Sequence, residues 1–201
     1  MDIEKLNMEC MHIYDATSIP ISPNTYHSES YSYQSVLNIN RESTSHVDIN
    51  EFNRNYFNSL LAHNDAFIGS LLHVDFEDGM DNEAIDFVEH SIKLNESVTY
   101  NWINRLFTLY MTDYRVISRL LRIIAALEIN DYSLSLADHI KAGLADKHVQ
   151  VQEAALMVIE SWASKECVDI LRTVNVSNKL IQNYADKLLV SIENKLLKNV
   201  C

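Results

Sequence analysis

Apolar residues recur every three or four positions through the second half of the chain. Between residues 103 and 163 this pattern occurs twice, at an offset of 33 residues, and each copy starts with an aspartate. The spacing is typical of amphipathic helices that begin at or near that aspartate. The positions aligned by this offset are Asp113 with Asp146, Val116 with Val149, Arg119 with Gln152, Leu121 with Ala154, Ile123 with Leu156 and Ala126 with Ile159. The pattern predicts stacked helical hairpins, which need neighbours to bury their apolar faces.

Helical periodicity continues on both sides of this double pattern. Asp48 is a predicted helix cap, a short helix is predicted from about Asp65, and a third, acidic helix has Glu83 in its first turn. Further helices are predicted near residues 99–111, 114–128, 133–145, 148–164, 166–174 and 178–198. In the last helix the expected inward stripe is Leu180, Tyr184, Leu188, Ile192 and Leu196. Such a helix, with one polar face, suits the end of a solenoid.

Several single residues carry more specific expectations. Asn130-Asp131 and Ser177 are predicted caps, and Gly143 is placed near a helix end where its conformational freedom is useful. Ala154 and Ala155 are small, so we expect two helices to approach closely there. The aromatic residues of the helix near 99–111, namely Trp102, Phe107 and Tyr110, could be core or binding residues, and the sequence favours core.

The first 47 residues have a different character. They include a Ser- and Tyr-rich stretch with both prolines, Pro20 and Pro23, and later an alternation that predicts either a short strand or an extended arm. We therefore divide the chain into an irregular N-terminal arm, 1–47, and a helical-repeat domain, 48–201. The domain has an acidic first part, 48–98, and a repeat part, 99–201. With only 3 glycines and 2 prolines in 201 residues, an all-α fold is favoured over sandwiches, barrels and nucleotide-binding α/β folds.

The residues after Asp146 resemble a known repeat family. The run Val151-Gln152-Glu153-Ala154-Ala155-Leu156 is similar to the second-helix signature of HEAT repeats, an Asp followed by Val-Arg-x-Ala-Ala. Gln152 stands where the family usually has Arg, the first-helix Pro is absent, and the earlier copy keeps Asp113 and Arg119. The resemblance extends over roughly residues 103–198 and implies a short α-solenoid with a scaffolding, adaptor or inhibitor role.

Charge divides the chain unevenly. Residues 1–60 hold 8 acidic and 3 basic side chains, 61–98 hold 9 and 1, and 99–201 hold 11 and 12. The net charge of −12 therefore belongs to the first half, which disfavours non-specific phosphate binding. Three scattered cysteines, an N terminus without signal-peptide features and the lack of a long apolar run favour a cytoplasmic protein without a membrane span.

Two charged groups are the candidate binding residues. The first is an acidic cluster: Asp75, Glu77, Asp78, Asp81, Glu83 and Asp86. Its spacing fails the EF-hand pattern, so we interpret it as a solvated acidic surface and expect no metal. The second is a basic stripe at i, i+4 and i+7 on one helix: Arg115, Arg119 and Arg122. It could bind a carboxylate-rich partner or a phosphate backbone, but pairing with the chain's own acidic half is favoured.

Catalytic motifs are weak in this sequence. The histidines and cysteines have no short metal-binding spacing, and no nucleophile elbow accompanies the many serines. We therefore expect neither catalytic residues nor cofactors. The favoured hypothesis is a protein-protein interaction module, an adaptor or an inhibitor of the antitoxin, immunity or phage-inhibitor type, whose partner has a basic face. The alternative is a nucleic-acid binder that resembles HEAT-like DNA glycosylases, with a groove lined by Arg115, Arg119, Arg122, Lys141, Lys147 and Arg172.

Overall fold

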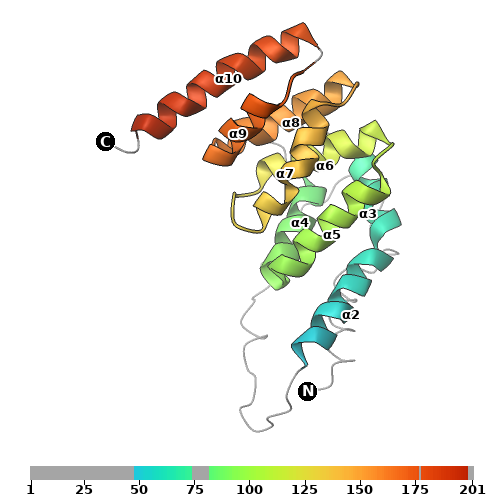
Figure 1. The fold of residues 1–201 in the computed structure, drawn as a ribbon. Helices are drawn as coiled ribbons and strands as arrows, with labels where there is room; N and C mark the ends of the chain where they lie inside the picture. Colours follow the sequence, from blue (N-terminus) through green and yellow to red (C-terminus); the bar gives the residue numbers. More distant parts are fainter. Residues whose placement is uncertain (1–47, 74–81, 177, 199–201) are drawn as a thin grey trace, which may run out of the picture. The chain divides into compact units, whose positions relative to one another are not determined.

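The structure is a computed structural model that describes residues 48–73, 82–176 and 178–198. These residues belong to the unit Asp48–Cys201, and every regular element in them is a helix (Figure 1). The elements are α2 (Ile49–Ala62), α3 (Asn64–His73), α4 (Glu83–Leu94), α5 (Glu96–Leu109), α6 (Tyr114–Ala126), the 3-10 helix η2 (Ser133–Leu136), α7 (Ala137–Leu144), α8 (Val149–Trp162), α9 (Lys165–Thr173) and α10 (Lys179–Lys198). The all-α prediction is confirmed for this part of the chain, whereas the predicted arm or strand lies outside the described residues.

Side-chain caps fix where several helices begin. Asp48 Oδ1 accepts a hydrogen bond from Asn50 N at 2.9 Å, and Asp113 Oδ1 accepts one from Arg115 N at 3.0 Å, so both predicted caps are confirmed. The predicted cap Ser177 lies outside the described residues, and Asn178 caps the first turn of α10. Such caps satisfy amide groups that have no partner within the helix.

The second aspartate of the aligned pair acts differently from the first. The N-cap of α8 is His148, and Asp146 lies two residues before it. Asp146 Oδ1 instead accepts from the backbone N–H of His148 at 2.7 Å, while the Gln152 amide donates to the Asp146 carbonyl at 2.6 Å. Asp146 therefore precedes the helix predicted near 148–164 and does not cap it.

Helices α6 and α8 pack side by side in the same direction. At their first turns the Tyr114 and His148 rings stack with centroids 4.3 Å apart, and at their ends Trp162 Nε1 donates to the Leu127 carbonyl at 3.2 Å. Their N-caps, Asp113 and His148, are 35 residues apart, so the two helices align at 35 residues and not at the predicted 33.

Burial shows why the offset of 33 is wrong. Val116 is buried with 1% of its surface exposed, whereas Val149, its partner at that offset, is 37% exposed. At an offset of 35 Val116 corresponds instead to Val151, which is fully buried. The alignment of Asp113 with Asp146 was misleading because Asp113 is a helix cap and Asp146 is not.

Helix α5 makes a smaller parallel contact with η2 and the first turn of α7. The Tyr100 and Tyr132 rings stack with centroids 6.2 Å apart, and the Phe107 and His139 rings stack at 4.4 Å. Between them Asn104 Oδ1 lies 2.9 Å from His139 Nε2. Helix α5 therefore runs in the same direction as η2 and α7, just as α6 runs in the same direction as α8.

Trp102 is at the centre of the packing among α3, α4 and α5. It is fully buried, its ring meets those of Phe67 and Phe87 edge to face, and its Nε1 donates to Asn64 Oδ1 at 2.7 Å. Phe107 is also buried, so the core interpretation of both aromatic residues is confirmed. Tyr110, at the end of α5, is half-buried and packs on the edge of the core.

Helices α6, α7 and α8 meet at Gly143. A Cβ atom at this position would lie 3.0 Å from Leu121 Cδ1 and 3.1 Å from Ala155 Cβ. Gly143 is therefore needed for close helix approach and not, as predicted, for its backbone freedom at a helix end. Ala154 and Ala155 are both fully buried, as expected of small residues at such a contact.

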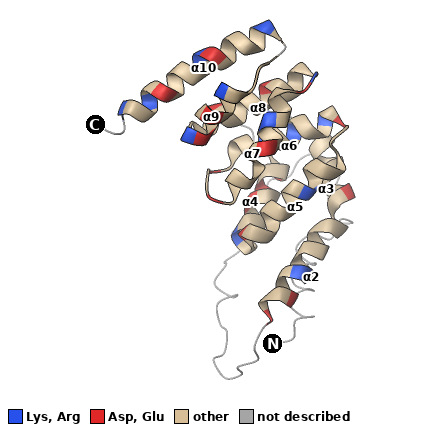
Figure 2. Ribbon diagram, in the orientation of Figure 1, with Lys and Arg blue, Asp and Glu red and all other residues tan. Residues whose placement is uncertain are grey.

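Helix α10 packs on α8 and α9, with a stripe that differs from the predicted one. Ile181, Ala185, Leu188 and Ile192 are buried, whereas Leu180 and Tyr184 are 78% and 44% exposed. The prediction thus chose the wrong apolar neighbour in the first two turns and the right residues afterwards. Lysines and acidic residues are interspersed along this helix (Figure 2), namely Lys179, Asp186, Lys187, Glu193, Lys195 and Lys198.

Candidate functional site

The basic stripe of α6 is largely engaged by the chain itself. Arg115 is exposed, and its guanidinium contacts the Asp113 carboxylate at 3.0 Å. Arg119 is partly buried, and its Nη1 donates to the Leu71 carbonyl in the last turn of α3 at 2.8 Å. A helix C-terminus carries partial negative charge, so this is a favourable place for a guanidinium. Arg122 is partly buried on the same side of α6.

The Asp113–Arg115 pair also changes both titrations. Hydrogen bonding from the Arg115 side chain lowers the pKa of the Asp113 carboxyl, and the same bond raises the pKa of Arg115. Since the Arg115 side chain is 61% exposed and that of Asp113 is 32% exposed, water screens this pair and it contributes little to folding. Its effect is to fix the first turn of α6, where Asp113 is the cap.

Only two members of the predicted acidic cluster can be placed. Glu83 and Asp86 are both exposed in the first turn of α4, where carboxylates favour the positive end of the helix dipole. Asp75, Glu77, Asp78 and Asp81 lie outside the described residues. In the described ranges the structure brings neither Glu83 nor Asp86 into an ion pair with the basic stripe of α6.

His139 and His148 take part in contacts between helices. His148 Nδ1 lies 2.8 Å from Asp146 Oδ1 while its ring stacks on Tyr114, and His139 stacks on Phe107 beside Asn104. Burial lowers the pKa of His139, with Asp138 acting weakly in the opposite direction. Across the ranges the structure describes, no three His, Cys, Asp or Glu side chains gather to hold a metal ion.

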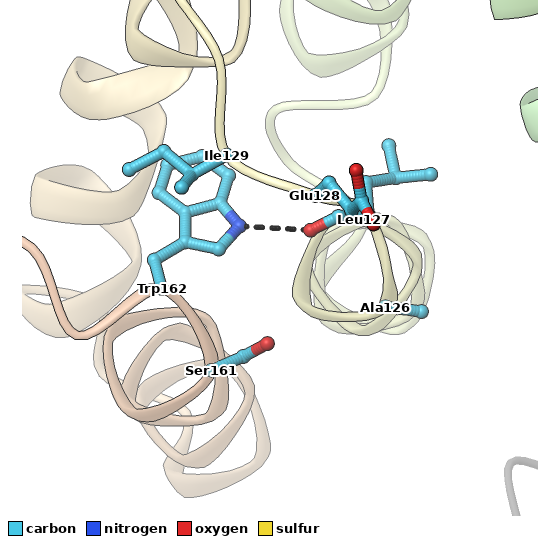
Figure 3. Close-up of a pocket in the computed structure, with 6 residues that line it drawn as sticks. All are labelled: Ala126, Leu127, Glu128, Ile129, Ser161 and Trp162. Atoms are coloured by element: carbon cyan, nitrogen blue, oxygen red, sulfur yellow. Dashed lines mark hydrogen bonds between the residues drawn. The ribbon is translucent and has the colours of Figure 1, made fainter.

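A surface depression of about 440 Å³ lies where α6 and α8 end. Six residues line it: Ala126, Leu127, Glu128, Ile129, Ser161 and Trp162. Figure 3 looks along both helices and shows the Trp162 indole between them, bonded to the Leu127 carbonyl, with Ile129 beside the ring and Ser161 on the facing side of α8. Glu128 is the one charged residue among the six, and it is exposed.

The sequence did not point to this depression. It depends on the two helix ends lying side by side, which pairs Leu127 with Trp162 at the offset of 35 residues. The predicted offset of 33 would have placed Trp162 one half-turn away from that partner. The sequence could have suggested the site only if the two helices had been aligned at an offset of 35 residues.

Comparison of the chain with known protein families, curated proteins and solved structures finds no match. The resemblance to HEAT repeats therefore stays a prediction from the residues that follow Asp113 and Asp146. None of the helices in the described ranges combines the length and apolar character that crossing a bilayer requires.

Proposed function

We propose that this chain is a non-catalytic protein-protein interaction module, an adaptor or inhibitor, built from HEAT-like helix pairs. In this proposal α5 with α6, and α7 with α8, are two successive units. The observation that supports it most is the double parallel contact: α5 packs along η2 and the first turn of α7, while α6 packs along α8. Stacked units of this kind expose helix ends and one helix layer in a row, which suits extended binding surfaces.

The proposed partner is a protein with a basic face, met in the cytoplasm. The net charge of −12 and the exposed carboxylates of Glu83 and Asp86 support this choice, because complementary charge speeds association and excludes wrong partners. The inhibitor types named above remain part of the proposal, because the small size and the acidity of the chain fit them.

Nucleic-acid binding is the weaker alternative. Of the six basic residues that could line a groove, four already contact acceptors of the chain: Arg115 contacts Asp113, Arg119 contacts Leu71, Lys141 contacts Asp138 and Arg172 contacts Glu193. Phosphate contacts made by these four residues would have to compete with the interactions within the chain. A duplex would also meet an unfavourable net charge.

The test is recovery of a partner from the native host by the tagged full-length protein at low and high salt. We expect a protein that is retained at low salt, released at high salt, and lost when Glu83→Lys and Asp86→Lys are combined. The matched control is Glu153→Lys, an exposed glutamate of α8, which should leave recovery unchanged. If the double variant recovers the same protein as the wild type, the acidic face of α4 is not the binding surface.

Fluorescence anisotropy with duplex and single-stranded DNA at low salt tests the alternative. Phosphate contacts are strongest under these conditions, so binding at tens of micromolar protein would favour the nucleic-acid hypothesis. Its absence, together with a salt-sensitive protein partner, would support the interaction module.

A further inference from the structure

We propose that the depression at the paired ends of α6 and α8 binds a cationic side chain of the partner, an arginine in the first place. The inference rests on the proposed function and adds a site and a ligand chemistry to it. It makes the ends of the two helices, and not only the acidic face of α4, part of the interaction surface.

The charges around the depression favour a cation. Helix α6 ends at Ala126 and helix α8 at Trp162, and both ends border the same depression. Of the last four carbonyls at each end, Ile124 O and Ile159 O accept from the caps Leu127 N and Ala163 N, whereas the others have no partner within the helix. The two helix dipoles place their negative ends together because the helices are parallel. Glu128 adds a full negative charge, and no Lys or Arg is among the six lining residues.

The depression is lined by both apolar and polar groups. Trp162 and Ile129 give an apolar wall, whereas Ser161 and Glu128 give polar groups on the other sides (Figure 3). An arginine side chain has an apolar stem and a planar charged head with five donors, so it can use both kinds of wall at once. A lysine has the same stem but a compact head, and it should bind more weakly.

The fold holds the depression open. The Trp162 indole is fixed by its hydrogen bond to the Leu127 carbonyl, and only 8% of the residue is exposed. Leu127 is itself buried and is the extended C-cap of α6. The walls of the depression therefore need little rearrangement on binding, which lowers the entropic cost.

The two tryptophans of the chain provide a direct assay. Trp162 lines the depression, whereas Trp102 is fully buried with its Nε1 bonded to Asn64, so their indole N–H signals in a nitrogen-proton correlation spectrum report on the site and on a control position. The probes are N-acetyl-argininamide, N-acetyl-lysinamide and N-acetyl-citrullinamide, which is nearly isosteric with the first but uncharged. Each is titrated into the full-length protein at low salt.

We expect the Trp162 signal to shift and saturate with the arginine probe, to shift less with the lysine probe and to stay unchanged with citrulline, while Trp102 does not move. Glu128→Gln should weaken arginine binding about threefold, the size expected for one exposed charge pair. The control Glu153→Gln should leave it unchanged. Equal shifts with arginine and citrulline, movement of both tryptophans, or the same affinity in both variants would each overturn the proposal.

This result is separable from the proposed function. If the probes leave Trp162 unmoved but a salt-sensitive protein partner is still recovered from the host, only the arginine site is lost. If the probes bind as expected but no partner is recovered at either salt concentration, the depression binds cations and the interaction module must be abandoned.

Discussion

Helices α6 and α8 lie in the same direction and in the same register, yet they use their equivalent positions in different ways. At the offset of 35 residues, Arg119 of α6 corresponds to Ala154 of α8. Arg119 is partly buried and donates to the end of α3, whereas Ala154 is fully buried among apolar neighbours. The first position joins helices by a charged hydrogen bond and the second by close approach.

The difference shows that a shared backbone arrangement does not require a shared contact chemistry. At these positions α8 has the Ala154-Ala155 pair, and Gly143 of α7 allows the backbones to approach there. In α6 the corresponding positions are Arg119 and Leu120, so α6 fills its neighbourhood with longer side chains. The contrast between the two helices can be tested by substitutions at these contacts.

The largest effect is expected for Ala155→Leu. Ala155 Cβ already lies 3.1 Å from where a Cβ of Gly143 would be, so three added carbons must displace α7. We expect a loss of about 3 kcal/mol in the free energy of unfolding, measured by urea denaturation. The control Ala142→Leu makes the same change at an exposed position of α7 and should be nearly neutral. Similar losses in both variants would mean that the α7–α8 contact is not close.

The second prediction concerns the charged contact of α6. Arg119→Gln shortens the side chain and removes the bond to the Leu71 carbonyl, so we expect a loss of about 1.5–2 kcal/mol in the free energy of unfolding. Arg115→Gln, the control, breaks only an exposed pair with Asp113 and should cost less than about 1 kcal/mol. If Arg119→Gln is as stable as the wild type and instead abolishes partner recovery, the stripe faces a partner and not α3.

The helix ends offer a third test, since α6 and α8 finish differently. Leu127 ends α6 with extended backbone angles, whereas Ala163 ends α8 at φ 43° and ψ 39°, in the left-handed region. Glycine adopts this region without the steric cost that alanine has, so Ala163→Gly should stabilise the protein by about 0.5–1 kcal/mol. The measurement is the thermal midpoint of unfolding.

Ala145→Gly is the matched control for the third test. Ala145 is the C-cap of α7 but has φ −85°, where glycine brings no relief and adds flexibility. We expect this variant to be neutral or slightly less stable. A gain of the same size at both positions would show that the backbone at Ala163 is not strained.

The sequence predicts the boundaries of the helices better than it predicts which of their residues are buried. The helices were predicted within about two residues for most elements, because each carries a clear apolar period and several carry a cap such as Asp48 or Asp113. The buried face of each helix was harder to predict. In α10, Leu180 and Ile181 are adjacent and both apolar, and only packing against α8 and α9 decides that Ile181 is buried.

The candidate site was the part that sequence could not give. Glu128, Ile129 and Ser161 have no distinctive pattern, and the depression exists only because two helix ends 35 residues apart lie together. The basic stripe was correctly placed on one side of α6. Its contact with the Leu71 carbonyl could not be foreseen, because a backbone acceptor leaves no trace in residue types.

The smallest effect is expected from the two histidine stacks that accompany the paired helices. His139 stacks on Phe107 between α7 and α5, as His148 stacks on Tyr114 between α8 and α6. Burial lowers the pKa of His139 below its ordinary value of 6.5. Below that pH the unfolded chain takes up a proton that the folded protein resists, so the unfolded state binds more protons and stability falls as the pH decreases.

Unfolding by urea between pH 8 and pH 5 therefore tests this contribution. The wild type should lose stability as the pH falls below about 6.5, whereas above it His139 should have no effect because it is neutral in both states. His139→Gln cannot take up the proton and should show a smaller loss over the same range. His73→Gln, at an exposed position at the end of α3, should retain the wild-type slope. A slope that is identical in His139→Gln and wild type would remove His139 as a source of the pH dependence and assign it to other groups.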